Sequence, residues 1–383
     1  MIPFNKPFLT GKETEYIVEA VNSGHISGNG LFTKKCHSFF TEKYGFHKVL
    51  LTTSCTDALE MCALLLDIKP GDEVIIPSYT FVSTALAFVR QGATIVFADS
   101  SLKHPNLDVD KLEGLITEKT KVIVPVHYAS MAVDMDKVME LAEKYNLFVV
   151  EDAAQAVNTF YKGKPLGGIG HLGAYSFHET KNFISGEGGM LVINDERLAE
   201  RAEIIWEKGT NRASFFRGEV NKYGWVDTGS SFLPSEITAA FLYAQLEKMD
   251  MIQRNRTYIW DLYYKGLKKL ETQGKIKLPI VPDYSTNNGH MFYILCRSLE
   301  ERKDLILYLK ERKILSVFHY LSLHKSEFYT KKHEGNELPL SDYYTNHLLR
   351  LPFYFELTDD DVKLVIKTII DFFDSIHDKI NIK

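Results

Sequence analysis

One lysine and one aspartate in this sequence have the types and surroundings that covalent carbonyl chemistry requires. Lys181 lies in the segment Ser176-Phe177-His178-Glu179-Thr180-Lys181-Asn182, at the end of an apolar stretch. Upstream, the apolar run from Leu147 to Val150 leads directly into Glu151 and Asp152. A lysine amine can form an imine, and a buried acid can keep a ring nitrogen protonated. Together the two residues predict the chemistry of pyridoxal phosphate (PLP).

The neighbours of both residues support this interpretation. Gly186-Glu187-Gly188-Gly189 follows Lys181 as a turn whose glycines permit close backbone approach. Cationic neighbours and burial would lower the pKa of the Lys181 ammonium and favour a nucleophilic amine. Gln155, three residues after Asp152, could reach a ring hydroxyl from the same helical face. The alternatives are a helix cap for Asp152 and a polar surface position for Gln155.

A phosphate group would need a separate site, and two segments offer one. Thr53-Ser54-Cys55-Thr56-Asp57 places hydroxyls and free amides at an expected helix start after a strand. Helix N-termini bind phosphate through unsatisfied N–H groups and the helix dipole. Simple capping by Ser54 or Thr56 is the alternative. Tyr79-Thr80-Phe81 offers an aromatic ring for stacking on a cofactor, or a core residue.

Short apolar strands alternate with amphipathic helices through the first part of the chain. We expect strands at 49–52, 73–76, 94–98, 122–126, 148–150 and 174–177, and helices at 11–23, 32–44, 56–66, 81–91, 110–116 and 135–145. This alternation predicts an α/β fold with a mostly parallel sheet covered on both faces, and ligands at the carboxyl ends of its strands. Residues at or just past those ends are Thr56, Tyr79, Asp99, His127, Asp152 and Lys181.

The pattern changes near residue 248. A long charged helix at 249–270 precedes short strands at 276–278, 290–296 and 316–319 and helices at 300–312 and 359–373. We therefore predict a large domain over residues 1–248 and a small α+β domain over 249–383. In the small domain His319, Tyr320 and His324 could line a substrate pocket, and structural roles are equally good interpretations.

Two other kinds of site are disfavoured. Gly168-Ile169-Gly170-His171-Leu172-Gly173 fits the dinucleotide pattern, but it follows a turn and precedes a strand, whereas that motif needs a strand before it and a helix after it. The 13 histidines show no metal-ligand spacing, so we expect no metal.

The bulk composition is that of an ordinary globular protein. Of 383 residues, 45% are hydrophobic and 25% charged, with a net charge of -5, which gives no reason to expect nucleic acid or an anionic membrane as a partner. The four cysteines contain no Cys-x-x-Cys pair and predict reduced, mostly buried thiols. We see no signal peptide, and the best apolar run, Met61 to Leu66, is too short to span a membrane. A soluble cytoplasmic protein is expected.

These segments together resemble the DegT/DnrJ/EryC1/StrS sugar aminotransferases over essentially the full chain. The matching stretches are residues 57–60, 77–84, 124–128, 151–155 and 176–182. Within that family the sequence is most similar to transaminases that make dTDP-4-amino-4,6-dideoxygalactose for the enterobacterial common antigen. Segments shared with them are residues 1–5, 176–182, 208–212 and 317–320.

The resemblance implies a fold-type I architecture, with a mostly parallel seven-stranded sheet in the large domain and a small C-terminal α+β domain, and a role for each site residue. It implies Lys181 as imine former and proton shuttle, Asp152 on the pyridine nitrogen and Gln155 near the ring oxygen. It also implies Phe81 stacked on the ring, with Thr56, the Asp57 amide and Ser176 on the phosphate. Many relatives add an asparagine from the neighbouring subunit, where this chain has Ser231. A water could bridge the shorter hydroxyl, and a homodimer with shared active sites is expected.

The implied reaction moves an amino group from L-glutamate to a nucleotide-linked keto sugar. The acceptor implied is dTDP-4-dehydro-6-deoxy-D-glucose, and the product is dTDP-4-amino-4,6-dideoxy-D-galactose. Amination at C3, a UDP- or GDP-linked sugar, or the other C4 epimer are alternatives. A sugar dehydratase on the same scaffold would carry histidine in place of Lys181. A regulatory protein without cofactor is the alternative from a different class.

Overall fold

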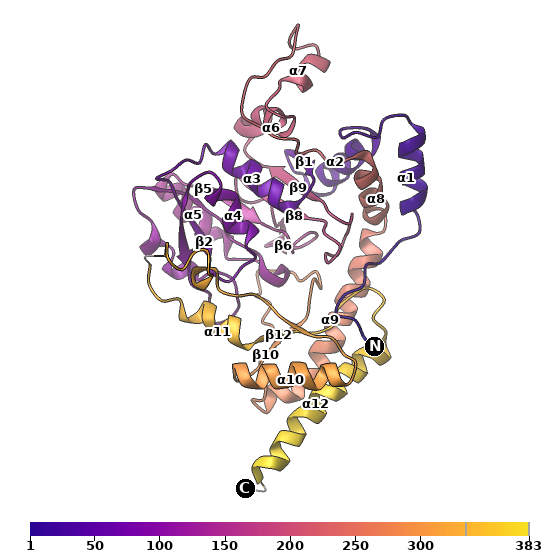
Figure 1. Cartoon of the computed structure of the whole chain (residues 1–383), viewed down its shortest axis with the longest axis vertical. Coiled ribbons are helices and arrows are strands. Elements are labelled where there is room, and N and C mark those ends of the chain that lie inside the picture. The colour runs from indigo at the N-terminus through magenta and orange to yellow at the C-terminus, as the bar shows by residue number, and fades with distance from the viewer. Residues whose placement is uncertain (334, 382–383) are drawn as a thin grey trace.

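A seven-stranded sheet forms the centre of the protein, which we describe from a computed structural model over residues 1–333 and 335–381 (Figure 1). Its strands are β1 (Lys48–Thr52), β2 (Glu73–Pro77), β3 (Thr94–Ala98), β4 (Thr120–Ile123), β5 (Phe148–Asp152), β8 (Leu172–Ser176) and β9 (Gly189–Ile193). The strand order is β1-β9-β8-β5-β4-β2-β3. Only β9 runs antiparallel to its neighbours in this sheet. The predicted mostly parallel sheet is therefore confirmed.

Helices cover both faces of this sheet because successive strand residues point in opposite directions. One face packs against α3 (Cys55–Leu65), α4 (Ser83–Val89) and α6 (Ala199–Trp206). The other packs against α1 (Glu13–Asn22), α2 (Leu31–Tyr44), α5 (Met135–Tyr145) and α8 (Glu236–Leu246). On β1, for example, Leu50 contacts the first layer while Val49 and Leu51 contact the second.

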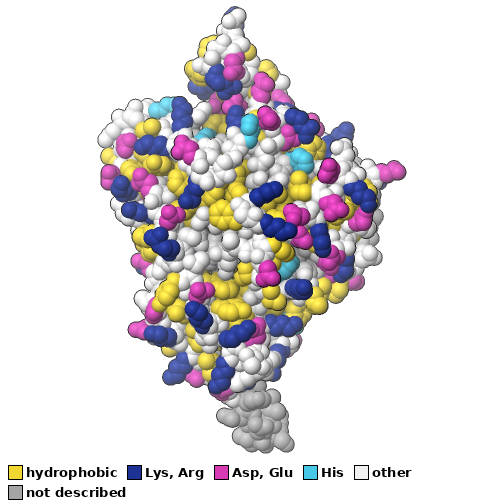
Figure 2. Space-filling view, turned by 180° about the vertical axis from the view of Figure 1, so that it is seen from behind, with side chains coloured by type: hydrophobic (Ala, Val, Ile, Leu, Met, Phe, Trp, Pro, Cys, Tyr) yellow, Lys and Arg dark blue, Asp and Glu magenta, His cyan; other side chains and the backbone are white. Residues whose placement is uncertain are grey.

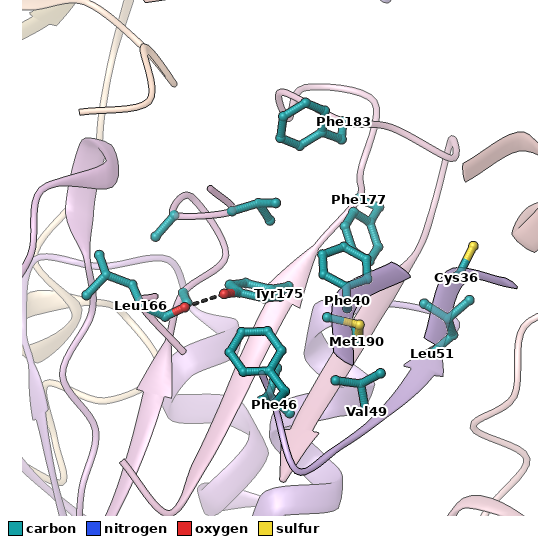
Figure 3. Close-up of a cluster of buried hydrophobic side chains, with 14 of the residues drawn as sticks. Cys36, Phe40, Phe46, Val49, Leu51, Leu166, Tyr175, Phe177, Phe183 and Met190 are labelled. Carbon is teal, nitrogen blue, oxygen red and sulfur yellow. Dashed lines mark hydrogen bonds between the residues drawn. The ribbon is translucent and has the colours of Figure 1, made fainter. Parts of the chain in front are cut away.

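Aromatic side chains fill the second layer where α2 crosses the sheet (Figure 3). Phe40 lies between Tyr175 and Phe177, with ring centroids 6.1 and 5.8 Å away. The Tyr175 hydroxyl donates to the Leu166 carbonyl, which satisfies the one polar atom of that side chain. Tyr175 and Phe177 flank Ser176 along the same strand, so this packing fixes the chain that leads to Lys181.

A second, smaller sheet lies below the first in Figure 1. It consists of β10 (Tyr293–Leu295), β11 (Val317–Phe318) and β12 (Leu348–Arg350), in the antiparallel order β10-β12-β11. One face packs against α9 (Met249–Thr272), α10 (Leu299–Glu311) and α12 (Asp359–Asn381). The other contributes Tyr293 and Leu348 to a cluster with Tyr79 and Tyr128 of the large sheet's carboxyl edge. These three helices therefore lie on one side of the small sheet, and its other side faces the large sheet.

The remaining elements are short. They are α7 (Arg212–Phe216), α11 (Pro339–His347), the hairpin β6 (Phe160–Tyr161) and β7 (Lys164–Pro165), and five 3-10 turns: η1 (Val109–Lys111), η2 (Glu113–Leu115), η3 (Tyr128–Ser130), η4 (Glu196–Leu198) and η5 (Leu323–Lys325). In Figure 1, α7 and its flanking loops project from the top of the molecule beyond α6.

Two expected elements are wrong. The helix expected at 110–116 is the pair of turns η1 and η2, because a segment of seven residues containing Gly114 gains too few intrahelical hydrogen bonds. The strand expected at 276–278 is a single bridge between Lys277 and Leu295. The seven strands of the large sheet were predicted, but no residue range was predicted for β9. The sequence at Gly189, the first residue of β9, is typical of a turn. The strand forms because β1 and β8 both pair with it.

Figure 2 shows both signs of charge interspersed over the face opposite to that of Figure 1. Across the described part of the chain, no helix has both the length and the apolar character needed to cross a membrane. All four cysteines are unpaired, and Cys55 is the least buried of them.

Candidate active site

A cavity of about 520 Å³ opens between the carboxyl edge of the large sheet and the side of the small sheet that faces it. Strand ends and helix starts from both sheets line it, as expected for a parallel sheet. The lining includes eight of the site residues predicted from the sequence: Thr56, Phe81, Asp152, Gln155, Ser176, Lys181, His319 and Tyr320. The site is therefore assembled from residues far apart in the chain.

Lys181 follows β8 in a tight turn, in which its amide donates to the His178 carbonyl at 2.8 Å. The pKa of its ammonium group is lowered to about 8, mainly by burial and also by the charge of Arg350, while Cys55 and Asp152 act in the opposite direction. An amine with this pKa is partly neutral near physiological pH, so it can act as a nucleophile.

Asp152 ends β5, and two donors hold its buried carboxylate. Thr84 Oγ1 donates to Oδ2 at 2.7 Å, and the Ala154 amide donates to Oδ1 at 3.2 Å. Thr80 Oγ1 lies 3.0 Å from Thr84 Oγ1 and continues the chain of hydroxyls. A carboxylate fixed in this way presents its remaining lone pairs to the cavity, where a protonated ring nitrogen could bind.

Gln155 is buried, and both the oxygen and the nitrogen of its side-chain amide form hydrogen bonds. Its Oε1 accepts from the Ala129 amide at 2.6 Å, and its Nε2 donates to the Tyr320 hydroxyl at 3.2 Å. The ring of Phe81 lies 5.9 Å from that of Tyr320, and Phe81 is 56% exposed even though it lines the cavity. An exposed aromatic face at the wall of a cavity is suited to stacking on a flat ligand.

The start of α3 forms another wall. Ser54 caps the helix, and its Oγ accepts from the Asp57 amide at 3.0 Å, so that amide would have to exchange partners to reach a phosphate. Thr56 Oγ1 lies 2.8 Å from Ser83 Oγ. The first N–H groups of the helix have no intrahelical acceptor, which leaves donors for an anion. Gly189 permits this arrangement, because a Cβ there would lie 2.3 Å from the Ser54 carbonyl carbon.

Three predicted site residues lie outside the cavity lining. Asp57 directly follows Thr56 of the lining, in the first turn of α3. Ser231 is exposed and outside the cavity lining, and it forms a single bridge with Glu207 beside the projecting α7 arm. His324 is also outside the lining. It is 3% exposed, and its Nδ1 lies 2.7 Å from Ser78 Oγ.

His324 also belongs to one arrangement of metal-ligand type, with Glu337 and Asp342. The ammonium of Lys325 lies 2.5 Å from Asp342 and 3.4 Å from Glu337. A lysine therefore already balances these two carboxylates.

The glycine run of dinucleotide type has a structural use. Its amides, those of Ile169 and Gly170, donate to Glu151 Oε1 at 2.7 Å each, and the preceding Gly167 amide donates to Oε2 at 2.8 Å. His127 Nε2 completes the shell of this fully buried carboxylate at 2.9 Å. The run therefore wraps an acid adjacent to Asp152 and fixes the end of β5.

Three residues that line the cavity were not predicted from the sequence, Cys55, His290 and Arg350, and neither was Thr84, which donates to Asp152. Thr84 lies in the segment 77–84, and its hydroxyl at a helix start was the available signal. His290 binds the Asn182 side chain at 3.1 Å. Arg350 has no local sequence signal, because β12 is short and lies near the end of the chain.

The residues present fit PLP. The cavity offers an amine of lowered pKa, an anchored carboxylate, an exposed aromatic face and a helix start with hydroxyls. These four features match the carbonyl, the ring nitrogen, the ring face and the phosphate of that cofactor.

Comparison with known proteins settles the family. Residues 7–370 match the model of the DegT/DnrJ/EryC1/StrS aminotransferase family. The chain belongs to this family. It is 33% identical over 373 residues to GDP-perosamine synthase of Escherichia coli O157:H7, covering 97% of this chain and 98% of that one. It is 32% identical over 382 residues to the spore coat polysaccharide biosynthesis protein SpsC of Bacillus subtilis, covering 97% and 96%.

Solved structures agree with this assignment. Spr1654 of Streptococcus pneumoniae in its PLP form matches with a TM-score of 0.89 and 28% identity, over 98% of this chain and 99% of that one. DesV of S. venezuelae, in complex with a ketimine intermediate, matches with a TM-score of 0.88 and 29% identity, over 97% and 98%. The protein is thus a PLP-dependent sugar aminotransferase, with an amino donor and a nucleotide-linked keto sugar as substrates.

Proposed function

We propose that this sugar aminotransferase transfers the amino group of L-glutamate to dTDP-4-dehydro-6-deoxy-D-glucose and forms dTDP-4-amino-4,6-dideoxy-D-galactose. The similarity of residues 1–5, 208–212 and 317–320 to the transaminases that make this sugar supports the choice. The observation that carries the chemistry is an amine of pKa about 8, Lys181, in one cavity with the anchored carboxylate of Asp152.

In this proposal each site residue has one task. When bound, PLP supplies an electron sink for the removal of a proton from the carbon that bears the nitrogen. Lys181 would hold the cofactor covalently, and its amine would carry that proton. Asp152 keeps the ring nitrogen protonated, and Gln155 lies near the ring oxygen. Phe81 stacks on the ring.

The phosphate is held at the start of α3 and by β8. Thr56 and Ser176 donate their hydroxyls to it, since both line the cavity. The Asp57 amide joins them by leaving Ser54, and the N–H groups before it at the helix start have no intrahelical acceptor. Residues 1–248 carry the cofactor contacts in this scheme, and residues 249–383 close the cavity from the other side.

A homodimer completes the site. Ser231 lies outside the cavity lining of its own chain, and it forms a bridge with Glu207, shortly before the projecting arm that carries α7 (Figure 1). This arm exposes Phe216 (69%) and Trp225 (84%), large apolar side chains that a partner subunit would cover. Ser231 would then reach the partner's phosphate site directly or through water. Light scattering on the purified protein should give the mass of a dimer, and a monomer that turns over substrate would contradict this part of the proposal.

The acceptor is tested with a panel of nucleotide-linked keto sugars and L-glutamate. Mass spectrometry of the products identifies which sugar gains nitrogen, and NMR places the new amine. We expect the dTDP-linked 4-keto sugar to be aminated at C4. The Lys181→Ala variant is the control and should form no product. A GDP-linked acceptor is the second candidate, because GDP-perosamine synthase is among the relatives.

A further inference from the structure

His290 lies in the wall of the cavity that contains Lys181, and its side chain is only 4% exposed. Its Nδ1 lies 3.1 Å from Oδ1 of Asn182, the residue that directly follows Lys181. Arg256 fixes the backbone at this point, because its Nε and Nη2 donate to the carbonyls of Gly289 and His290 at 3.0 and 2.8 Å. The ring is therefore held beside the turn that carries the lysine.

The contact with Asn182 determines which ring nitrogen of His290 carries the proton. Nδ2 of Asn182 donates to the Asn288 carbonyl at 2.9 Å, so Oδ1 faces His290 and can only accept. Nδ1 of His290 is therefore the donor. Burial, and next the charges of Lys181 and Arg350, hold the pKa of His290 well below its usual value, so the ring is neutral. A neutral ring protonated at Nδ1 has a bare lone pair at Nε2.

Nε2 of His290 is an acceptor without a donor. Over residues 1–333 and 335–381, no side chain or amide forms a hydrogen bond with it. His319, which also lines the cavity, differs because both of its ring nitrogens are engaged: Nδ1 lies 3.0 Å from the Tyr128 hydroxyl and Nε2 lies 3.3 Å from Arg350 Nη1. A buried acceptor that lacks a donor favours a ligand that brings one.

The two substrates of the proposed function differ in what they offer to this nitrogen. The amino-acid donor brings carboxylates, whose lone pairs would face that of Nε2. The acceptor sugar brings hydroxyls, and its carbonyl carbon must reach the reaction position beside Lys181. In a 4-keto-6-deoxy sugar the neighbours of that carbon are C5, which bears the ring oxygen and the methyl group, and C3, which bears a hydroxyl. The C3 hydroxyl is thus the sugar's hydrogen-bond donor next to the reacting carbon.

We propose that Nε2 of His290 accepts a hydrogen bond from the C3 hydroxyl of the acceptor sugar and thereby selects keto sugars that carry this hydroxyl. Asn182 is a positioning residue, because it holds the ring in the tautomer that leaves the acceptor free. This inference rests on the proposed function, because it assigns a specificity contact for the acceptor of that reaction. A site that accepts from a substrate hydroxyl rejects the analogue without it, since the acceptor is then left unpaired.

Two acceptors and matched variants test this contact. The acceptors are the dTDP-linked 4-keto-6-deoxy sugar and its 3-deoxy analogue, each mixed with holoenzyme that has first reacted with L-glutamate. His290→Asn keeps a donor for Asn182 but has no atom at the position of Nε2, whereas His290→Gln retains an acceptor near that position. His47→Asn, which changes an exposed histidine, is the control.

We expect the wild type to prefer the acceptor with the C3 hydroxyl by about 20-fold in kcat/KM. His290→Asn should lose about 20-fold on that acceptor and should treat the two sugars alike within about threefold. His290→Gln should recover part of the preference, and His47→Asn should behave as the wild type. In His290→Asn, the donor half-reaction with L-glutamate and the affinity of the apoenzyme for PLP should stay within about threefold of the wild type.

NMR of labelled histidine nitrogens tests the tautomer without turnover. The signals that are absent from His290→Asn belong to His290. In the wild-type holoenzyme they should show a proton on Nδ1 and a bare Nε2 down to about pH 6. Asn182→Leu removes the acceptor of Nδ1 and should allow the proton to move to Nε2.

Equal kcat/KM of the wild type for the two sugars, or a preference that persists in His290→Asn, would overturn the proposal. Equal losses in both half-reactions would overturn it as well and would assign His290 to the common chemistry. A wild-type ring protonated at Nε2 would refute the acceptor role. If His290→Asn does not fold, the preference of the wild type and its partial recovery in His290→Gln decide the question. Amination of a different sugar in the panel of acceptors would refute the proposed function instead, and the tautomer of His290 would be unaffected.

Discussion

The lowered pKa of Lys181 predicts that the apoenzyme reacts covalently with PLP at a pH where an ordinary lysine does not. Burial is the main cause of the shift from 10.5 to about 8. At pH 7.5 a lysine of pKa 8 is roughly one-quarter neutral, whereas a lysine of pKa 10.5 is neutral in about one molecule in a thousand. The reactive fraction is therefore larger by about 200-fold at this pH.

The assay mixes apoenzyme with PLP and follows the absorbance change of the covalent attachment between about pH 6 and pH 11. N-acetyl-lysine, measured in parallel, corrects for the titration of the cofactor itself. We expect the corrected rate to rise with a midpoint near 8 and to be level above about pH 9. A rate that continues to rise to about pH 10.5 would show that the site does not activate this amine.

Two substitutions test the cause of the shift by moving the midpoint in opposite directions. Arg350 lowers the pKa of Lys181, so Arg350→Met should raise the midpoint. Asp152 raises it, so Asp152→Asn should lower the midpoint. Shifts in the same direction would refute an electrostatic origin and point to a general change in the fold.

Three further predictions concern stability and cofactor binding. Between pH 8 and 10.5 the unfolded chain keeps Lys181 protonated, whereas the folded apoprotein does not. The free energy of unfolding of the wild type, measured in urea, should therefore rise across this pH range relative to that of Lys181→Met, by at most about 3 kcal/mol. A difference that does not change with pH would contradict the lowered pKa. Thr84→Val removes a donor to Asp152 and should weaken PLP binding about tenfold in equilibrium titration, whereas Thr84→Ser should restore it; equal affinities would show that this hydroxyl does not position the carboxylate. Glu151→Gln removes one of the two carboxylate oxygens that accept from the buried amides of Gly167, Ile169 and Gly170. It should lower the free energy of unfolding by about 2–5 kcal/mol. An unchanged urea midpoint would contradict a stabilising role for this carboxylate.

Much of the fold and of the chemical centre could be predicted from the sequence. The strands of the parallel sheet are continuous apolar runs, and such runs are visible without tertiary information. Lys181 and Asp152 could be paired because each follows one of these runs, and the carboxyl ends of parallel strands meet at one edge. Gln155 was predicted from its spacing of three residues after Asp152, although residues 153–159 form turns and not the expected helical face.

The parts that could not be predicted depend on contacts between distant segments. Arg350 reaches the cavity from a three-residue strand whose position is set by pairing with β10 and β11. The strand β9 has a glycine start and is a strand only because it lies between β1 and β8. His324 looked like a pocket residue from its position near Tyr320, yet the chain turns at η5 and buries it against Ser78.

The most direct test of the central claim is the position of the covalent bond to the cofactor. Borohydride reduction of the holoenzyme fixes that bond, and proteolysis with mass spectrometry locates the modified peptide. We predict a single pyridoxyl group, attached to Lys181 in the segment Ser176–Asn182, and none in Lys181→Ala. A modification on any other lysine, or a cofactor that leaves the protein after reduction, would contradict the assignment of this site.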